Sequence, residues 1–133
     1  MASETRVLIR TDADILSARQ SARGLSATLG ISSIDQTLLA TAISEIARNI
    51  LTYARAGEIL LSVRTDGVRR GVQVIARDEG PGIEDLELAM RDGYSSSGSL
   101  GLGLPGANRI MDEFAVRSEA GRGTTITMTK WAR

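Results

Sequence analysis

The sequence predicts a single domain of the α/β class, in which helices cover one face of one sheet. Three observations favour this two-layer sandwich. Short segments rich in β-branched residues recur along the chain, and longer segments repeat apolar residues at helical spacing. The two kinds follow the order β, α, α, β, β, α, loop, α, β, β. The length of 133 residues fits one domain, so residues 1–133 are expected to fold as one unit.

The composition excludes several classes of function. Sixteen basic and sixteen acidic residues cancel, so charge gives no reason to expect nucleic acid or an anionic membrane as a partner. Without cysteine or histidine there can be no disulfide, thiolate metal site, Ser-His-Asp triad or HExxH zinc site. The single lysine, Lys130, lies in neither a Walker A loop nor the early strand of a eukaryotic-type protein kinase. Any general base should therefore be a carboxylate.

The chain is expected to be cytoplasmic. No apolar run approaches the ~20 residues of a membrane span. The first residues lack the basic-then-apolar order of a signal peptide, and the absence of cysteine fits a reducing compartment.

The N-terminal segment predicts a strand and a helix. Residues 5–11 are short and β-branched, which is typical of a strand. A helix should follow, capped by Asp12 or Asp14 and ending at Gly30. Its apolar residues at helical spacing are Ile15, Leu16, Ala18, Ala22, Leu25 and Leu29.

The second predicted helix has the clearest pattern. Ser32 or Ser33 should cap it, and it should end near Arg55. Its apolar stripe consists of Leu39, Ile43, Ile46, Ile50 and Tyr53.

The remaining elements are shorter. Residues 58–64 and 71–77 read as two strands joined by a turn at Asp66-Gly67. After a short acidic helical stretch and a polar loop, three further elements are expected: a helix over 103–114 and strands over 115–118 and 125–129.

Glu45 and Asn49 are the first candidate functional pair. Four residues apart on the second helix, they point from one face, about 40° apart around the axis. The stripe at Ile46 and Ile50 is displaced by roughly 100°, so the pair should border the core. Such a pair can offer a carboxylate base and an amide oxygen for a metal ion. The alternative is an ordinary polar helix face.

Asp78 is the second candidate. It follows an apolar strand and begins the turn Asp78-Glu-Gly80-Pro-Gly82. A carboxylate at the end of a strand can accept a hydrogen bond from an exocyclic amine, and glycines allow a planar ring to approach closely. The alternative is a Pro-Gly turn with a capping aspartate.

The glycine-rich segment 98–106 is the third candidate. Its core matches Gly-x-Gly-x-x-Gly, but a dinucleotide-binding fingerprint should follow a buried strand, and this segment follows a polar loop. Backbone amides at the start of a helix can still bind phosphate.

The three segments are followed by a fourth, Gly121-Arg-Gly-Thr124-Thr125-Ile126. In this order, the four segments resemble the N box, G1 box, lid and G2 box of the GHKL superfamily. The resemblance covers essentially the whole chain. It implies the Bergerat ATP-binding fold, a two-layer sandwich with a mixed, mostly antiparallel sheet. Within the superfamily, residues 43–50, 101–106 and 111–114 are most similar to the RsbT-type switch kinases of the stressosome, whose relatives are the RsbW and SpoIIAB anti-sigma-factor kinases.

The resemblance also implies roles for particular residues. Glu45 would be the catalytic base, and Asn49 would coordinate the Mg²⁺ that bridges the phosphates of ATP. Asp78 would bind the adenine amino group, and residues 83–100 would form the lid. The full set implied to bind ATP is Asn49, Asp78, Gly80, Gly82, Ile83, Ser99, Leu100, Gly101, Leu102, Gly103, Gly106, Thr124 and Thr125.

The function implied by the resemblance is a serine/threonine protein kinase. It would transfer the γ-phosphate of ATP to a STAS-domain stressosome protein of the RsbS or RsbR kind. It would also activate a PP2C-type phosphatase of the RsbU kind by switching partners. The alternatives are an anti-sigma-factor kinase that sequesters a sigma factor, an ATPase in the manner of Hsp90 or MutL, and an ATP-gated binding module without turnover.

Overall fold

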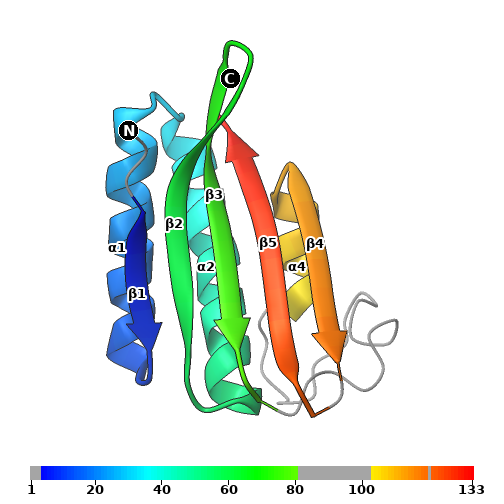
Figure 1. The fold of residues 1–133 in the computed structure, drawn as a ribbon. Helices are drawn as coiled ribbons and strands as arrows, with labels where there is room; N and C mark the ends of the chain where they lie inside the picture. The colour runs from blue at the N-terminus through cyan, green and yellow to red at the C-terminus, as the bar shows by residue number, and fades with distance from the viewer. Residues whose placement is uncertain (1–3, 81–102, 120) are drawn as a thin grey trace.

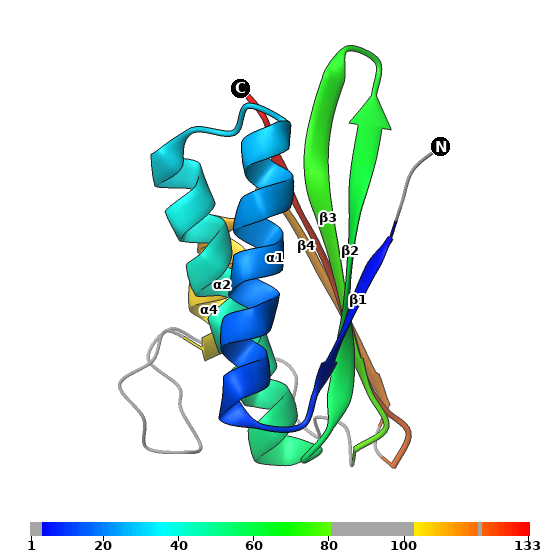
Figure 2. The same ribbon diagram turned by 90° about the vertical axis from the view of Figure 1, so that its left-hand side faces the viewer.

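The computed structural model describes residues 4–80, 103–119 and 121–133. In this part of the chain, three helices cover one face of a five-stranded sheet (Figure 1). Figure 2 shows the two layers from the side, with the helices packed against the sheet. The predicted two-layer sandwich is therefore confirmed.

The described strands lie in the order β1-β2-β3-β5-β4. All four neighbouring pairs are antiparallel, so the sheet is not mixed within the described residues. The strands span Thr5–Ile9 (β1), Gly57–Asp66 (β2), Arg69–Asp78 (β3), Glu113–Glu119 (β4) and Gly123–Trp131 (β5). The predicted hairpin is present and joins β2 to β3, but Asp66 pairs with Arg69, so the turn is Gly67-Val68, one residue later than the predicted Asp66-Gly67.

Helix α1, Asp12–Thr28, begins one residue earlier than the predicted caps imply. Thr11 is its N-cap, so the prediction of Asp12 or Asp14 as the cap is wrong. Asp14 instead accepts hydrogen bonds from the backbone amides of Arg10 (2.8 Å) and Thr11 (2.9 Å). These two bonds lower the pKa of the Asp14 carboxyl, because they stabilise its ionised form.

Helix α2, Ser33–Tyr53, is capped as predicted by Ser32, whose hydroxyl oxygen accepts a hydrogen bond of 3.2 Å from the Asp35 amide. It ends two residues before the predicted Arg55, which has a left-handed backbone with φ of 71°. The predicted stripe is buried except at Tyr53, which is 41% exposed. The stripe therefore ends one turn earlier than its spacing predicted.

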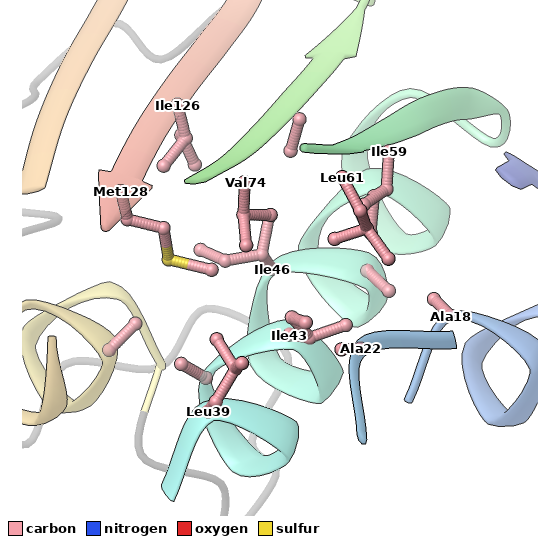
Figure 3. Close-up of a cluster of buried hydrophobic side chains, with 14 of the residues drawn as sticks. Ala18, Ala22, Leu39, Ile43, Ile46, Ile59, Leu61, Val74, Ile126 and Met128 are labelled. Atoms are coloured by element: carbon pink, nitrogen blue, oxygen red, sulfur yellow. The ribbon is translucent and has the colours of Figure 1, made fainter. Parts of the chain in front are cut away.

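The core lies between the helices and the sheet and is aliphatic. Figure 3 shows Ile43 and Ile46 of α2 facing side chains of the central strands, among them Val74 and Met128. Ala18 and Ala22 bring α1 against α2 in the same cluster. Burial of this face fixes the rotation of α2 about its axis, and so fixes where its polar residues lie.

Helix α4, Gly103–Ile110, is shorter than predicted. Glu113 and Phe114 belong to β4, because the Asp112 amide donates a hydrogen bond of 3.0 Å to Thr129 of β5 and starts the strand pairing there. The predicted helix over 103–114 is therefore wrong in its last turn. None of the described helices is long and apolar enough to cross a membrane.

Candidate nucleotide site

The predicted site residues that the structure describes come from four elements, and three of them, α2, β3 and β5, end or begin at one edge of the fold, the lower edge in Figure 1. Strand β3 ends there at Asp78, and β5 begins there at Gly123. Helix α2 also ends at this edge, close to the turn after Asp78. The chain thus places the ends of α2 and β3 and the start of β5 side by side.

Asp78 and Thr124 are directly opposite each other on paired strands. Opposite residues of an antiparallel pair point to the same face of the sheet, and here that face is the one the helices cover. The Asp78 carboxylate accepts a hydrogen bond of 2.9 Å from the Gly80 amide and another from the Thr124 amide. Burial nevertheless raises the pKa of Asp78, and the two amide hydrogen bonds oppose this rise.

Thr124 is held from the other side by a residue that the sequence did not single out. The hydroxyl groups of Thr124 and Ser118 are 2.9 Å apart, and Thr124 is only 6% exposed. Ser118 lies opposite Thr124 because of the register between β4 and β5. The alternation of residues in β4 was the one feature of the sequence that could have indicated Ser118. Thr125, which the resemblance offered beside Thr124, follows it in the strand and so points to the opposite face.

The turn at Asp78–Gly80 fits tightly between α2 and β5. A Cβ atom on Gly80 would lie 2.5 Å from the Cβ atom of Ala54, the C-cap residue of α2. A Cβ atom on Gly123 would collide with the carbonyl oxygen of Asp78 and lie 2.9 Å from the Cα atom of Glu79. Two glycines thus bring this turn, and with it the Asp78 carboxylate, into a fixed position.

Glu45 and Asn49 lie half-buried on α2, next to the buried Ile46 and Ile50. The prediction that the pair borders the core is therefore confirmed. Among the described residues, no three acidic, histidine or cysteine side chains gather into a group that could hold a metal ion. An isolated amide oxygen such as that of Asn49 fits Mg²⁺ only where a substrate supplies most of the other oxygen ligands.

Helix α4 points its N-terminus toward the same edge. Its last residue, Ile110, accepts a hydrogen bond of 2.8 Å from Lys130 near the far end of β5. Gly103, its first residue, therefore lies toward the end of β5 that holds Thr124, with Gly106 in the first turn. Free amides and the helix dipole favour a phosphate group at such a terminus. The predicted Gly82, Ile83, Ser99, Leu100, Gly101 and Leu102 lie outside the described residues, as does the whole predicted lid, residues 83–100.

Comparison with known proteins agrees with this geometry. Residues 34–132 match the family described as histidine kinase-, DNA gyrase B- and HSP90-like ATPases. The chain is 47% identical over 133 residues to the serine/threonine-protein kinase RsbT of Bacillus subtilis, and the match covers 100% of both chains. It is 31% identical over 121 residues to the anti-sigma F factor of Geobacillus stearothermophilus, covering 85% of this chain and 81% of that one.

Solved structures share the fold at low sequence identity. The mycobacterial sensor histidine kinase MprB superposes with a TM-score of 0.56 at 15% identity, covering 100% of this chain and 99% of that one. The catalytic domain of histidine kinase ThkA superposes with a TM-score of 0.53 at 14% identity, covering 98% and 95%. With the full-length match to RsbT, these likenesses place the molecule among known proteins: the chain belongs to the GHKL family of histidine kinase-, DNA gyrase B- and HSP90-like ATPases, and within it to the family of RsbT and the anti-sigma F factors.

Proposed function

We propose that this chain is a serine/threonine protein kinase that transfers the γ-phosphate of ATP to a STAS-domain stressosome protein. The observation that supports the proposal is that the Asp78–Thr124 pair and the end of helix α2, the helix of Glu45 and Asn49, lie at one edge of the fold, toward which the start of α4 points. The full-length similarity to a serine/threonine kinase supports the choice of a protein hydroxyl group as the acceptor.

Adenine would be recognised by Asp78. Its carboxylate is held by two backbone amides and can accept a hydrogen bond from the exocyclic amine of the base. Gly80 and Thr124, with Gly82 and Ile83 beyond the described residues, would line the base. Phosphates would lie at the start of α4, where Gly103 and Gly106 join the preceding Ser99, Leu100, Gly101 and Leu102.

Asn49 would provide a ligand for Mg²⁺, and the phosphate oxygens of ATP would complete its coordination. When bound, the ion neutralises charge that develops on the phosphates. Glu45 would take the proton from a serine or threonine hydroxyl group as that oxygen bonds to the γ-phosphorus. The bond from the γ-phosphorus to the β–γ bridging oxygen breaks, and ADP leaves.

Release and capture of partners would follow from this reaction. Phosphorylation of the STAS-domain protein would free the kinase to bind and activate a PP2C-type phosphatase. We propose that residues 1–133 act as one domain in this exchange and that it takes place in the cytoplasm. The sequence contains no histidine, so this chain cannot phosphorylate a histidine of its own as a histidine kinase does.

Sequestration of a sigma factor is the second candidate function. The similarity to anti-sigma F factors over 85% of the chain favours it, because the two functions would share one nucleotide site. Capture of a purified sigma factor in the presence of Mg-ATP would distinguish it from the first.

The test is transfer of γ-labelled phosphate from Mg-ATP to a purified STAS-domain stressosome protein. Glu45→Ala should lower the rate of transfer by about 10²–10⁴-fold while ATP still binds, as expected for loss of a general base. Asn49→Ala should weaken both Mg-ATP binding and transfer, because it removes a ligand of the ion.

Two matched variants control for the loss of a side chain. Glu4→Ala and Asn108→Ala make the same chemical changes at exposed positions and should transfer phosphate at the wild-type rate. If the wild type binds ATP and the STAS-domain protein but transfers no label, the proposal that this chain phosphorylates a STAS-domain protein is wrong. An ATP-gated binding protein, or a kinase for another substrate, would then be the remaining function.

A further inference from the structure

A second recessed surface lies at the opposite end of the sheet. A pocket of about 620 Å³ is lined there by Leu29, Val68, Arg69, Arg70, Trp131, Ala132 and Arg133. It lies where the β2–β3 hairpin projects beyond the rest of the fold, beside the C-terminal residues, at the upper end of Figures 1 and 2. We call it the hairpin pocket.

The hairpin pocket is remote from the candidate nucleotide site. Arg69 begins β3 and Asp78 ends it, so the two lie nine positions apart along one extended strand. At a rise of ~3.3 Å per residue, that is about 30 Å. A partner bound in the hairpin pocket would leave the nucleotide site open.

The charged residues that line the hairpin pocket are all basic. Three of its seven lining residues are arginines, and none is acidic. Arg69 is paired with Asp66 at 2.6 Å, and Arg133 is paired with Asp112. Arg70 follows Arg69 in β3, so its side chain points to the other face of the strand; it is exposed, and among the described residues it has no hydrogen bond or ion pair. An unpaired guanidinium group can bind a carboxylate with two parallel hydrogen bonds.

The hairpin pocket also offers apolar surface. Val68 is 101% exposed at the tip of the hairpin, in a position where polar residues are usual. Leu29 and Ala132 contribute further apolar atoms to the lining. The Arg69 guanidinium lies 4.2 Å from the centre of the Trp131 ring, and this stacking helps to hold the hairpin in place beside the C-terminal residues.

We propose that the hairpin pocket is a docking site for an acidic segment of a partner protein that carries an apolar side chain. The arginines fit the carboxylates of such a segment, and Val68 and Leu29 fit its apolar side chain. A protein segment meets both kinds of surface at once, whereas a small inorganic anion would use only the arginines. This proposal goes beyond the kinase function and does not depend on it.

The test is a titration of the full chain, labelled with ¹⁵N, with end-blocked peptides of sequence EDLEDL and QNLQNL. The acidic peptide should shift the amide resonances of residues 68–70 and 131–133 and leave those around Asp78 in place. The neutral peptide should bind about tenfold more weakly, because it has the same shape but no charge. Raising the salt concentration should weaken only the acidic peptide.

Arg70→Glu should weaken binding of the acidic peptide by about fivefold or more through charge reversal. The matched control is Arg117→Glu, since Arg117 is exposed on β4 and its side chain also has no ion pair among the described residues. Arg117→Glu should bind the acidic peptide as tightly as the wild type does. Both variants should bind ATP as tightly as the wild type does. Unchanged ATP binding separates this test from that of the kinase function.

Four results would overturn the proposal. The first is the absence of shifts at residues 68–70 and 131–133 at millimolar acidic peptide. The second is equal binding of the two peptides, and the third is equal loss of peptide binding in Arg70→Glu and Arg117→Glu. The fourth is a stronger effect on the same resonances from an oligothymidine, which would make nucleic acid the partner of this surface.

Discussion

The side-chain ammonium group of Lys130 donates a hydrogen bond of 2.8 Å to the carbonyl oxygen of Ile110, the last residue of helix α4. Lys130 is only 4% exposed. Its nitrogen also lies 3.7 Å from a carboxylate oxygen of Asp35 and 3.9 Å from one of Asp112. One buried cation thus connects β5 with the first turn of α2, the end of α4 and the start of β4.

Replacing Lys130 by methionine should lower the free energy of unfolding by about 2–4 kcal/mol. The Ile110 carbonyl would lose its side-chain donor, and among the described residues Asp35 and Asp112 would keep only the exposed Arg133 as a cation. Urea denaturation measures the change. The control is Arg122→Met, which breaks an exposed ion pair of 3.6 Å with Glu119 and should cost at most about 0.5 kcal/mol. Equal midpoints for the two variants would show that the buried contacts of Lys130 contribute little.

The sequence predicted the order of the described elements, because each depends on local patterns. The stripe of α2, the β2–β3 turn and the position of Asp78 after an apolar strand are all visible within a few residues. The role of Lys130 was not predictable in this way. Lysine is usually exposed, and its partners here lie 95 and 18 residues away in the chain.

The end of α4 was mispredicted for a similar reason. Phe114 follows Ile110 by four residues, a spacing that fits one more turn of helix. In the structure, Phe114 lies opposite Met128 in the sheet and reaches the core from a strand. Only the pairing of Asp112 with Thr129 decides between the two, and it is a long-range contact. Long-range pairing also decides which of Thr124 and Thr125 points to the face that the helices cover.

Gly123 should tolerate no side chain. In Gly123→Ala, the new Cβ atom would overlap the backbone of Asp78 and Glu79, and φ at this position is +96°. We expect the free energy of unfolding to fall by about 2–4 kcal/mol, and ATP to bind more weakly because the Asp78 turn must move. Thermal denaturation and nucleotide titration measure the two effects.

Gly121→Ala is the matched control for Gly123. Gly121 has a similar φ of +81°, but an added Cβ atom would meet nothing within 4 Å. It should cost only the strain of the backbone, about 1 kcal/mol, and leave ATP binding unchanged. If the two alanine variants lost equal stability, backbone strain rather than the close approach to Asp78 would account for the glycine at position 123.

Replacing Arg55 by glycine should stabilise the folded protein. It follows the C-terminal end of α2 in the left-handed region, with φ of 71°, where glycine is usual. Arg55→Gly should raise the free energy of unfolding by about 0.5–1 kcal/mol because the strain of the side chain is removed. Arg48→Gly, at an exposed position inside α2, should lower it by about 1 kcal/mol. A loss of stability in Arg55→Gly would mean that the arginine side chain makes a stabilising contact that outweighs the strain.

Asp78→Asn should weaken the binding of ATP by about 10–100-fold, because a charged acceptor for the adenine amine is replaced by a neutral amide. Isothermal titration with ATP measures the change. The control is Asp66→Asn at the end of β2, an exposed position, which should bind ATP as the wild type does. ATP binding that is unaffected by Asp78→Asn would exclude Asp78 from adenine recognition.

The variant Asp78→Asn should also show how much burial of the Asp78 carboxylate lowers the free energy of unfolding. Burial raises the pKa of Asp78 in the folded chain above its ordinary value of 3.8. Folding therefore favours the protonated form, and the stability that this form provides is lost as the pH rises through the raised pKa. The free energy of unfolding of Asp78→Asn, relative to wild type, should be greatest near neutral pH and should decrease as the pH falls through that pKa. Urea denaturation of both proteins across this range measures it, and a difference that grew on acidification would mean that the amide hydrogen bonds of Gly80 and Thr124 outweigh burial.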